Sequence, residues 1–395
     1  LGNLNLKKRK CKFSFMEEWK EYKLGEVAIQ VRDRIETSNL DSSSYISTEN
    51  MLPNKAGVTL SSGIPSGNAI KFKNGDVLIS NIRPYFKKIW RADIVGGCSA
   101  DVICLRASKE IEPLFLYYLL SQDLFFDYVM QGAKGTKMPR GDKNQIMQWP
   151  IMLPSIKEQQ GISAILKSLD DKIEVNRQIN DNLEQQGQAL FEEYVMNPNK
   201  PRTQLLNDYA LINPTRTISK GRVARCIDMS SLPTKGTFPS DWTFKEFNGG
   251  MKFQNGDTIM ARITPCLENG KTAYINFLDE NEVAFGSTEY IVLSAQEGIC
   301  SELLYFLARY DDFVSYAVAH MNGSSGRQRV SGNDIANYVM PEITNETMGI
   351  VSEKLHKIME VIKNNSLESR HLAEIRDALL PRLMSGELKL EETKM

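Results

Sequence analysis

The chain has 395 residues, of which 42% are hydrophobic and 25% charged, and a formal net charge of −1. This length suffices for two hydrophobic cores, since domains usually contain about 100–200 residues. No apolar stretch approaches the roughly 20 residues that a membrane-spanning helix needs. The balanced charge argues against a uniformly basic nucleic-acid binder, so any such surface must be local.

Two features bear on the cellular context. The basic segment 7–12 is not followed by an apolar secretory segment, and we expect residues 1–15 to be a disordered extension before a start at Met16. The six cysteines are spread over both halves and form no CxxC pair. That pattern is typical of a reduced, cytoplasmic protein rather than of a disulfide or zinc framework.

An internal repeat determines the expected architecture. Residues 71–79 (KFKNGDVLI) recur as residues 252–260 (KFQNGDTIM), 181 positions later. Residues 116–119 (LYYL) recur as residues 304–307 (LYFL), 188 positions later. Two copies of one unit, which differ by short loop insertions, therefore cover nearly the whole chain.

Each copy begins with a globular part of mixed secondary structure. Short β-like segments recur at matching places, at 76–80, 101–106, 257–261 and 290–294, and the first and third of them follow Asn-Gly turn signals. A helix-like segment follows in each copy, at 113–130 and at 301–320. We therefore expect two similar α+β domains, at 16–155 and 198–345.

Each copy ends in a predicted long helix, at 156–197 and at 346–390, in which apolar residues alternate at spacings of three and four. The predicted pairing positions are Leu166, Leu169, Ile173, Asn176, Leu183, Leu190, Leu355, Ile358, Ile362, Asn365, Leu372 and Leu379. Each stripe could simply pack on its own domain, but two matched heptad patterns in one chain favour a coiled coil between the helices. The expected fold class is α+β, with two similar domains separated by a pair of long antiparallel helices and an internal pseudo-two-fold repeat.

The expected helix pair would act as a spacer. Over its patterned length the first helix would rise about 42 Å, comparable with the roughly 34–36 Å between DNA half-sites one turn apart. Both stripes are polar at their centres, with Asn176 and Asn180 in the first and Asn365 and Ser369 in the second. Antiparallel pairing would bring these residues opposite one another, where a polar layer costs stability but fixes register.

A glycine-rich basic loop occurs at the same place in both copies, as glycine loop 1 (132–143) and glycine loop 2 (323–333). Glycine allows close backbone approach, Lys, Ser and Thr suit phosphates, and Arg and Gln suit base edges. Most such loops are merely solvated, but recurrence at one repeat position favours DNA contacts. The candidates are Lys134, Thr136, Lys137, Arg140, Lys143, Ser325, Arg327, Gln328, Arg329 and Ser331.

A second basic segment follows the strand of the repeated NGD sequence. Strand-end loop 1 (81–91) contains four cations and no acid, and strand-end loop 2 (262–271) is less basic. Phe86 and Trp90 are expected to cover the core. The candidate DNA contacts are Arg83, Tyr85, Lys87, Lys88, Arg262, Thr264 and Lys271. Framework residues match between the copies whereas these candidates differ, which predicts an asymmetric, two-part DNA target.

Three segments resemble the specificity subunits of Type I restriction–modification enzymes. Residues 153–162 (LPSIKEQQGI) and 379–388 (LLPRLMSGEL) resemble their conserved helical regions, and 75–85 (GDVLISNIRPY) resembles the framework of their target recognition domains. The resemblance extends over residues 17–390. The second copy departs from it, because 345–348 (NETM) replaces the Glu-Gln-Gln sequence and Thr264 stands at the position of Arg83.

This resemblance implies a non-catalytic subunit that holds no cofactor and binds double-stranded DNA through two target recognition domains. It also implies assembly with two methylation subunits, which bind S-adenosylmethionine and methylate adenine. Two restriction subunits, which use ATP and Mg, can join them. The helices would be the docking surface for these partners, and the first predicted helix is acidic.

The sequence offers no pattern of a catalytic site. It lacks the Asn-Pro-Pro-Tyr sequence of adenine methyltransferases and the GxxxxGK[ST] phosphate loop, and its three histidines are not spaced as metal ligands. The alternative from another class is a tandem coiled-coil scaffold that binds proteins but no nucleic acid. Steep salt dependence of DNA binding would distinguish the two.

Overall fold

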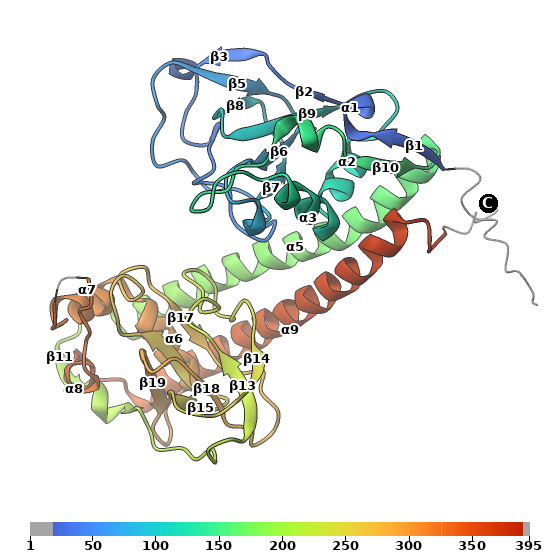
Figure 1. Ribbon diagram of the computed structural model, residues 1–395. Coiled ribbons are helices and arrows are strands. Elements are labelled where there is room, and N and C mark those ends of the chain that lie inside the picture. Colours follow the sequence, from blue (N-terminus) through green and yellow to red (C-terminus); the bar gives the residue numbers. More distant parts are fainter. Residues whose placement is uncertain (1–18, 325, 390–395) are drawn as a thin grey trace, which may run out of the picture. The chain divides into compact units, whose positions relative to one another are not determined.

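The computed structural model describes residues 19–324 and 326–389, so the expected extension and Ser325 lie outside the described residues. The chain divides into two compact units (Figure 1). Unit 1 contains the chain up to Asp171 together with the segment from Ala373 onward, and unit 2 contains Lys172–Leu372. Each unit therefore includes one globular domain and a part of both long helices.

The domain of unit 1 is built on two four-stranded sheets. The first is antiparallel, in the order β2 (Ala28–Gln30), β9 (Val102–Ala107), β6 (Val77–Ser80) and β7 (Ile89–Arg91). The second has the order β3 (Arg34–Glu36), β5 (Asn68–Phe72), β8 (Gly96–Cys98) and β4 (Tyr45–Ile46), with β4 parallel to β8. A small sheet pairs β1 (Lys20–Lys23) with β10 (Pro150–Leu153). The remaining elements are α1 (Leu24–Val27), η1 (Thr37–Asn39), η2 (Pro84–Phe86), α2 (Pro113–Leu120), α3 (Asp123–Gln131) and α4 (Lys143–Ile146).

Strand β6 is buried on both faces, which explains its unbroken apolar sequence. Val77 and Ile79 pack in the core formed with α2 and α3, whereas Leu78, which points to the opposite face, packs in the core of the second sheet. Both strand-end loop 1 and the NGD turn are therefore anchored by a central strand.

The domain of unit 2 repeats this plan with one change. Its first sheet has the order β12 (Ala210–Ile212), β19 (Tyr290–Ala295), β16 (Thr258–Ala261) and β17 (Thr272–Tyr274), and β11 (Arg202–Leu205) pairs with β20 (Val339–Pro341). The second sheet has the order β14 (Thr243–Glu246), β13 (Val223–Ile227), β18 (Ala284–Gly286) and β15 (Lys252–Phe253). The other elements are η3 (Leu206–Asp208), α6 (Ser301–Arg309), α7 (Asp311–Ala319) and α8 (Gly332–Ala336). Three strands of this second sheet match unit 1, but the fourth is added at the opposite edge.

The prediction of one helix at 113–130 and one at 301–320 was wrong, because each of these segments forms two helices. Gln122, before α3, and Tyr310, before α7, both have extended backbones that end the preceding helix. Asp123 and Asp311 then begin the new helices, where the helix dipole favours an acidic side chain. The break was missed because apolar residues continue on both sides of the short polar sequences Ser121-Gln122-Asp123 and Arg309-Tyr310-Asp311.

The two long helices are α5 (Ile156–Tyr194) and α9 (Asn345–Met384), both shorter at the C-terminal end than predicted. Pro198 follows α5 closely and cannot continue a helix, and Gly386 after α9 has a left-handed backbone (φ 71°) typical of helix ends. Among the described helices, none is long and apolar enough to cross a membrane.

Within each unit the segments of α5 and α9 are antiparallel and in contact (Figure 1). In unit 1, Leu166 shares a core with Leu380 and Leu383. In unit 2, the Asn365 amide donates to Asn180 Oδ1 at 2.9 Å, and Asn176 Nδ2 lies 3.2 Å from Ser369 Oγ. The central polar residues therefore meet, as antiparallel pairing requires.

All twelve predicted pairing residues are buried or half-buried. They do not form a free-standing coiled coil, however, because Leu355 and Ile362 belong to the same core as the domain of unit 2, and Leu183 and Leu190 pack against it. The two interpretations of the stripes thus both apply: each stripe packs on the partner helix and on a domain.

Candidate nucleic-acid interface

In unit 1 the two predicted basic loops contact each other. The backbone N–H of Arg83, in strand-end loop 1, donates to the carbonyl of Pro139 in glycine loop 1 at 2.8 Å. Glycine loop 1 closes on itself through Lys134 and Arg140, whose backbone groups exchange two hydrogen bonds of 2.9 Å. The two loops therefore form one junction with a single surface.

Unit 2 builds the same junction at matching positions. The N–H of Thr264 donates to the carbonyl of Gln328 at 3.1 Å, and Asn322 and Arg329 exchange two backbone hydrogen bonds of 2.9 Å. Sequence analysis proposed the loops separately, and only the tertiary structure brings them together.

An ion pair at matching positions fixes each glycine loop. Arg140 lies 3.3 Å from a carboxylate oxygen of Asp101, and Arg329 lies 2.7 Å from Glu289. The hydrogen bonds from Arg329 hold the pKa of Glu289 below its ordinary value. These two arginines, which we expected to contact DNA, have a framework role in the protein. Sequence analysis missed their partners, although the acids recur 188 positions apart.

A lysine at matching positions braces each strand-end loop. Lys88 Nζ donates to the carbonyl of Thr48 at 2.7 Å, and Lys271 Nζ donates to the carbonyl of Met229 at the same distance. Burial, reinforced by the charge of Arg83, lowers the pKa of Lys88. Both amines therefore stabilise the junction, a structural role that the sequence did not indicate.

Three further candidates contact helix starts or the neighbouring backbone. Lys87 pairs with Asp123, the first residue of α3, at 2.9 Å. Lys143 Nζ donates to the carbonyl of Ala100 at 3.3 Å. Ser331 caps α8, since its Oγ accepts from the N–H of Asp334 at 3.1 Å.

The glycine loop of unit 1 ends in a similar cap. Asp142 accepts from the backbone N–H groups of Asn144 and Gln145 at the start of α4, and these bonds lower its pKa. Lys134 lies 3.3 Å from the same carboxylate but remains 84% exposed. Its ammonium group is therefore still accessible for a phosphate.

Four further candidates are accessible, three in the glycine loops and one, Tyr85, in strand-end loop 1. Thr136, Lys137 and Arg327 are exposed, and within the described part of the chain the side chains of Lys137 and Arg327 make no hydrogen bond or ion pair. Tyr85 is 47% exposed and packs on Phe86. These accessible residues differ between the copies, whereas the bracing residues match.

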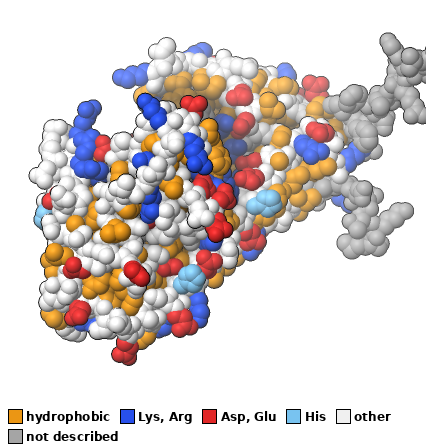
Figure 2. Space-filling model, turned by 90° about the horizontal axis from the view of Figure 1, so that it is seen from below, with side chains coloured by type: hydrophobic (Ala, Val, Ile, Leu, Met, Phe, Trp, Pro, Cys, Tyr) orange, Lys and Arg blue, Asp and Glu red, His pale blue; other side chains and the backbone are white. Residues whose placement is uncertain are grey.

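The positive charge is local rather than general. On the face drawn in Figure 2, lysine and arginine side chains occur in separate groups with aspartate and glutamate between them. This distribution agrees with the net charge of −1. Nucleic-acid contacts would therefore depend on the two junctions rather than on a general basic surface.

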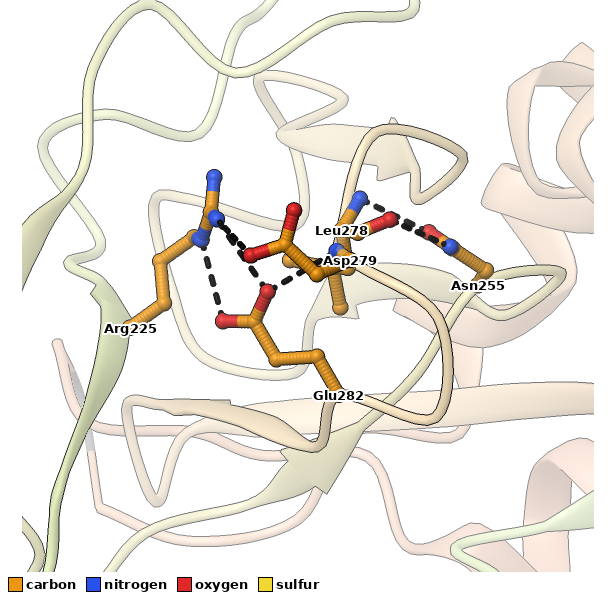
Figure 3. Close-up of polar contacts among 5 residues, drawn as sticks. All are labelled: Arg225, Asn255, Leu278, Asp279 and Glu282. Atoms are coloured by element: carbon orange, nitrogen blue, oxygen red, sulfur yellow. Dashed lines mark hydrogen bonds and ion pairs between the residues drawn. The ribbon is translucent and has the colours of Figure 1, made fainter.

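Unit 2 contains an inserted loop. In the sequence this insertion is visible only as a change in the offset, the number of residues that separate matching positions of the two copies. The offset is 183 at Lys88 and Lys271 but 188 at Asp101 and Glu289, which places an insertion between β17 and β18. Figure 3 shows how the inserted segment is held. The two side-chain groups that hold it come from β13 and from the NGD turn.

Arg225, which is nine-tenths buried, lies 3.0 Å from Glu282 and 3.4 Å from Asp279. Asn255 exchanges two hydrogen bonds with the backbone of Leu278, at 2.8 and 2.9 Å. The insertion is thus held against the core of unit 2, to which it contributes its own Leu278.

Comparisons with known proteins agree with this geometry. Residues 16–185 match the family described as the Type I restriction modification DNA specificity domain. The Type I restriction enzyme HindI specificity subunit of Haemophilus influenzae is 22% identical, and the alignment covers 94% of this chain and 100% of that protein. The MjaIX specificity subunit of Methanocaldococcus jannaschii is 24% identical over 70% of this chain and 69% of that protein.

A solved structure shares the fold. The S subunit of a Type I restriction–modification system from M. genitalium aligns with a TM-score of 0.56 at 16% identity, over 93% of this chain and 96% of that chain. The chain is therefore similar over nearly its whole length to Type I restriction–modification specificity subunits, and its residues 16–185 match their DNA specificity domain.

Proposed function

We propose that this chain gives a Type I restriction–modification complex its DNA target, with each domain reading one half of an asymmetric, two-part site. The observation that carries the proposal is the junction of two basic loops, built at matching positions in both units but with unlike accessible residues. A palindrome reader would need the same contacts in both copies. Specificity subunits are the non-catalytic recognition component of such systems, so the chemistry belongs to partner subunits.

The accessible cations suit two kinds of contact. Lys134, Lys137 and Arg327 are exposed near the tips of the glycine loops, where a flexible cation can reach a phosphate. Thr136, Tyr85, Thr264 and Gln328 offer hydroxyl and amide groups that can contact the sugar–phosphate backbone or base edges. The braced residues Arg140, Arg329, Lys88, Lys271 and Ser331 position the junction and contribute chiefly to its electrostatic potential.

The paired helices would set the spacing between the two half-sites in the target. The polar layer of Asn176, Asn180 and Asn365 fixes their register by hydrogen bonds. The surface of α5 would also dock two methylation subunits, which bring S-adenosylmethionine. Two restriction subunits that use ATP and Mg would complete a cleaving complex, and this chain would hold neither cofactor.

The proposal is tested by co-expressing the chain with the methylation subunits of its system and mapping the methylated adenines by sequencing. We expect one two-part motif whose halves differ. A palindromic motif would contradict the asymmetry. A chain that supports no methylation and shows no salt-sensitive DNA binding would instead act as a protein scaffold, since phosphate contacts always release counterions.

A further inference from the structure

Each junction contains an arginine whose buried nitrogen has no partner. The Nε atoms of Arg83 and Arg262 are shielded from solvent and make no hydrogen bond. Among the described residues, no side chain hydrogen-bonds or ion-pairs with either guanidinium. Buried polar groups are nearly always hydrogen-bonded, so an unsatisfied one at a surface junction needs an explanation.

Arg83 is held in a conformation that is unfavourable by itself. Its backbone is left-handed (φ 50°, ψ 62°), a region that residues other than glycine rarely adopt. Two hydrogen bonds maintain it, from its N–H to Pro139 and from the N–H of Phe86 to its carbonyl at 3.0 Å. The backbone that carries this guanidinium is therefore fixed before any ligand arrives.

Arg262 is equally fixed in unit 2. Its N–H donates to the carbonyl of Glu289 and its carbonyl accepts from the N–H of Val330, both at 3.0 Å. The charge of Arg262 helps to lower the pKa of the Glu289 carboxyl group. The oxygens of Glu289, however, already accept three hydrogen bonds from Arg329. Among the described residues, the guanidinium of Arg262 therefore has no hydrogen-bond acceptor of its own.

The two arginines do not occupy the same repeat position. Arg83 corresponds to Thr264, whereas Arg262 corresponds to Asn81, two residues earlier in the copy. Bracing residues match between the units, as shown by Lys88 and Lys271. The two arginines therefore leave the backbone at different places in the two junctions.

We propose that Arg83 and Arg262 are the principal base-reading residues, one for each half-site, and that each recognises a guanine. This inference rests on the proposed function. Guanine O6 and N7 are the acceptor pair that a guanidinium contacts with two parallel hydrogen bonds. Because the side chains leave the backbone at different repeat positions, the two guanines lie at different places within their half-sites.

The test uses the chain co-expressed with its methylation subunits and a DNA library that carries every single-base change in the mapped target. Arg83→Lys keeps the charge but loses the planar fork, so discrimination at one guanine of one half-site should fall about 10- to 100-fold. Arg262→Lys should act in the same way on the other half-site only. Lys137→Gln and Arg327→Gln are the matched controls, and they should weaken methylation of all sequences evenly.

Thermal unfolding checks that the variants remain folded. Equal loss on all sequences with Arg83→Lys or Arg262→Lys would reduce these arginines to phosphate contacts and overturn the inference. A wild-type half-site without guanine would overturn it for that domain. The proposed function fails differently, since wild-type chain would then show no two-part target at all.

Discussion

Each unit buries a carboxylate at the same position of the repeat, but the arginine that pairs with it comes from a different repeat position in each unit. In unit 1, Asp76 of the NGD turn binds Arg106 of β9, at 2.8 and 2.7 Å. In unit 2, the matching Asp257 binds Arg216, at 2.6 and 2.7 Å. Arg216 matches Arg34 of unit 1 in the repeat, and Ser294 stands where unit 1 has Arg106. Each acid is 1% exposed, so the fold requires a guanidinium there but not a particular residue to supply it.

The contact between the domain and the long helix shows a similar exchange. In unit 1 the buried amide of Gln159 on α5 accepts from the N–H of Glu112, before α2, at 2.9 Å. In unit 2 the matching Met348 on α9 accepts through its sulfur from the N–H of Cys300 at 3.4 Å. The missing Glu-Gln-Gln sequence of the second copy is therefore replaced by a weaker version of the same contact.

One layer of the helix pair is polar in unit 1 and apolar in unit 2. In unit 1, Asp170 accepts from Tyr118 at 2.6 Å and from Arg376 at 2.7 Å. In unit 2, the position matching Tyr118 is Phe306, and its ring occupies the space that a side chain at Gly187 would fill. The comparison teaches that the repeat preserves where elements meet, while each unit solves the contact with its own chemistry.

The largest effect is expected for the buried ion pairs. Arg106→Ala and Arg216→Ala should each lower the free energy of unfolding of their own unit by about 3–5 kcal/mol, because a buried carboxylate loses its partner. Chemical denaturation, with hydrogen exchange of peptides from each unit, measures this. Arg106→Ala combined with Asp76→Ala should restore much of the loss. An Arg106→Ala variant as stable as wild type would show that unit 1 does not need the pair.

Gly187→Ala should destabilise unit 2 by about 1–3 kcal/mol, because the new Cβ overlaps the ring of Phe306. This reverses the normal effect, since alanine usually stabilises a helix interior by about 1 kcal/mol. Gly349→Ala in α9 is the matched control, because nothing lies within 4 Å of its added Cβ. Thermal unfolding should therefore move in opposite directions for the two variants, and a gain for both would contradict the packed apolar layer.

Exchanging the residues of the domain–helix contact should have a smaller effect. Gln159 also donates to the carbonyls of Glu110 and Pro154, so Gln159→Met should cost unit 1 about 1–2 kcal/mol by leaving buried groups unpaired. Met348→Gln should change unit 2 by less than about 1 kcal/mol, because a hydrogen bond to Cys300 is retained. Urea denaturation of both variants tests this order, and equal losses would show that the two contacts are equivalent.

The smallest effect concerns the ion pairs of the glycine loops and depends on pH. The pKa of Glu289 is lowered in the folded protein by Arg329, so its contribution is present above the ordinary value of 4.5 and is lost as pH falls through the lower folded pKa. Glu289→Gln should therefore destabilise unit 2 at pH 7 but match wild type in strong acid. Asp101→Asn, which breaks the longer pair of unit 1, should have less effect at pH 7. A pH series of unfolding curves measures both.

The duplication, the two α+β domains, the antiparallel helices and the positions of the four basic loops could all be predicted from the amino-acid sequence. These features follow from local periodicity and from comparison of one half of the chain with the other. The sequence did not reveal that the predicted helices at 113–130 and 301–320 are broken, because apolar residues continue on both sides of each break.

Which of the basic side chains already have a partner within the protein could be seen only after folding. Lys88 and Lys271 bind carbonyls about 40 residues away in the chain, and Arg140 and Arg329 bind acids 39 and 40 residues away. The partner of a charged side chain depends on how distant segments pack, which neither composition nor spacing records. The folded junction therefore separates bracing cations from accessible ones, although in the sequence they look alike.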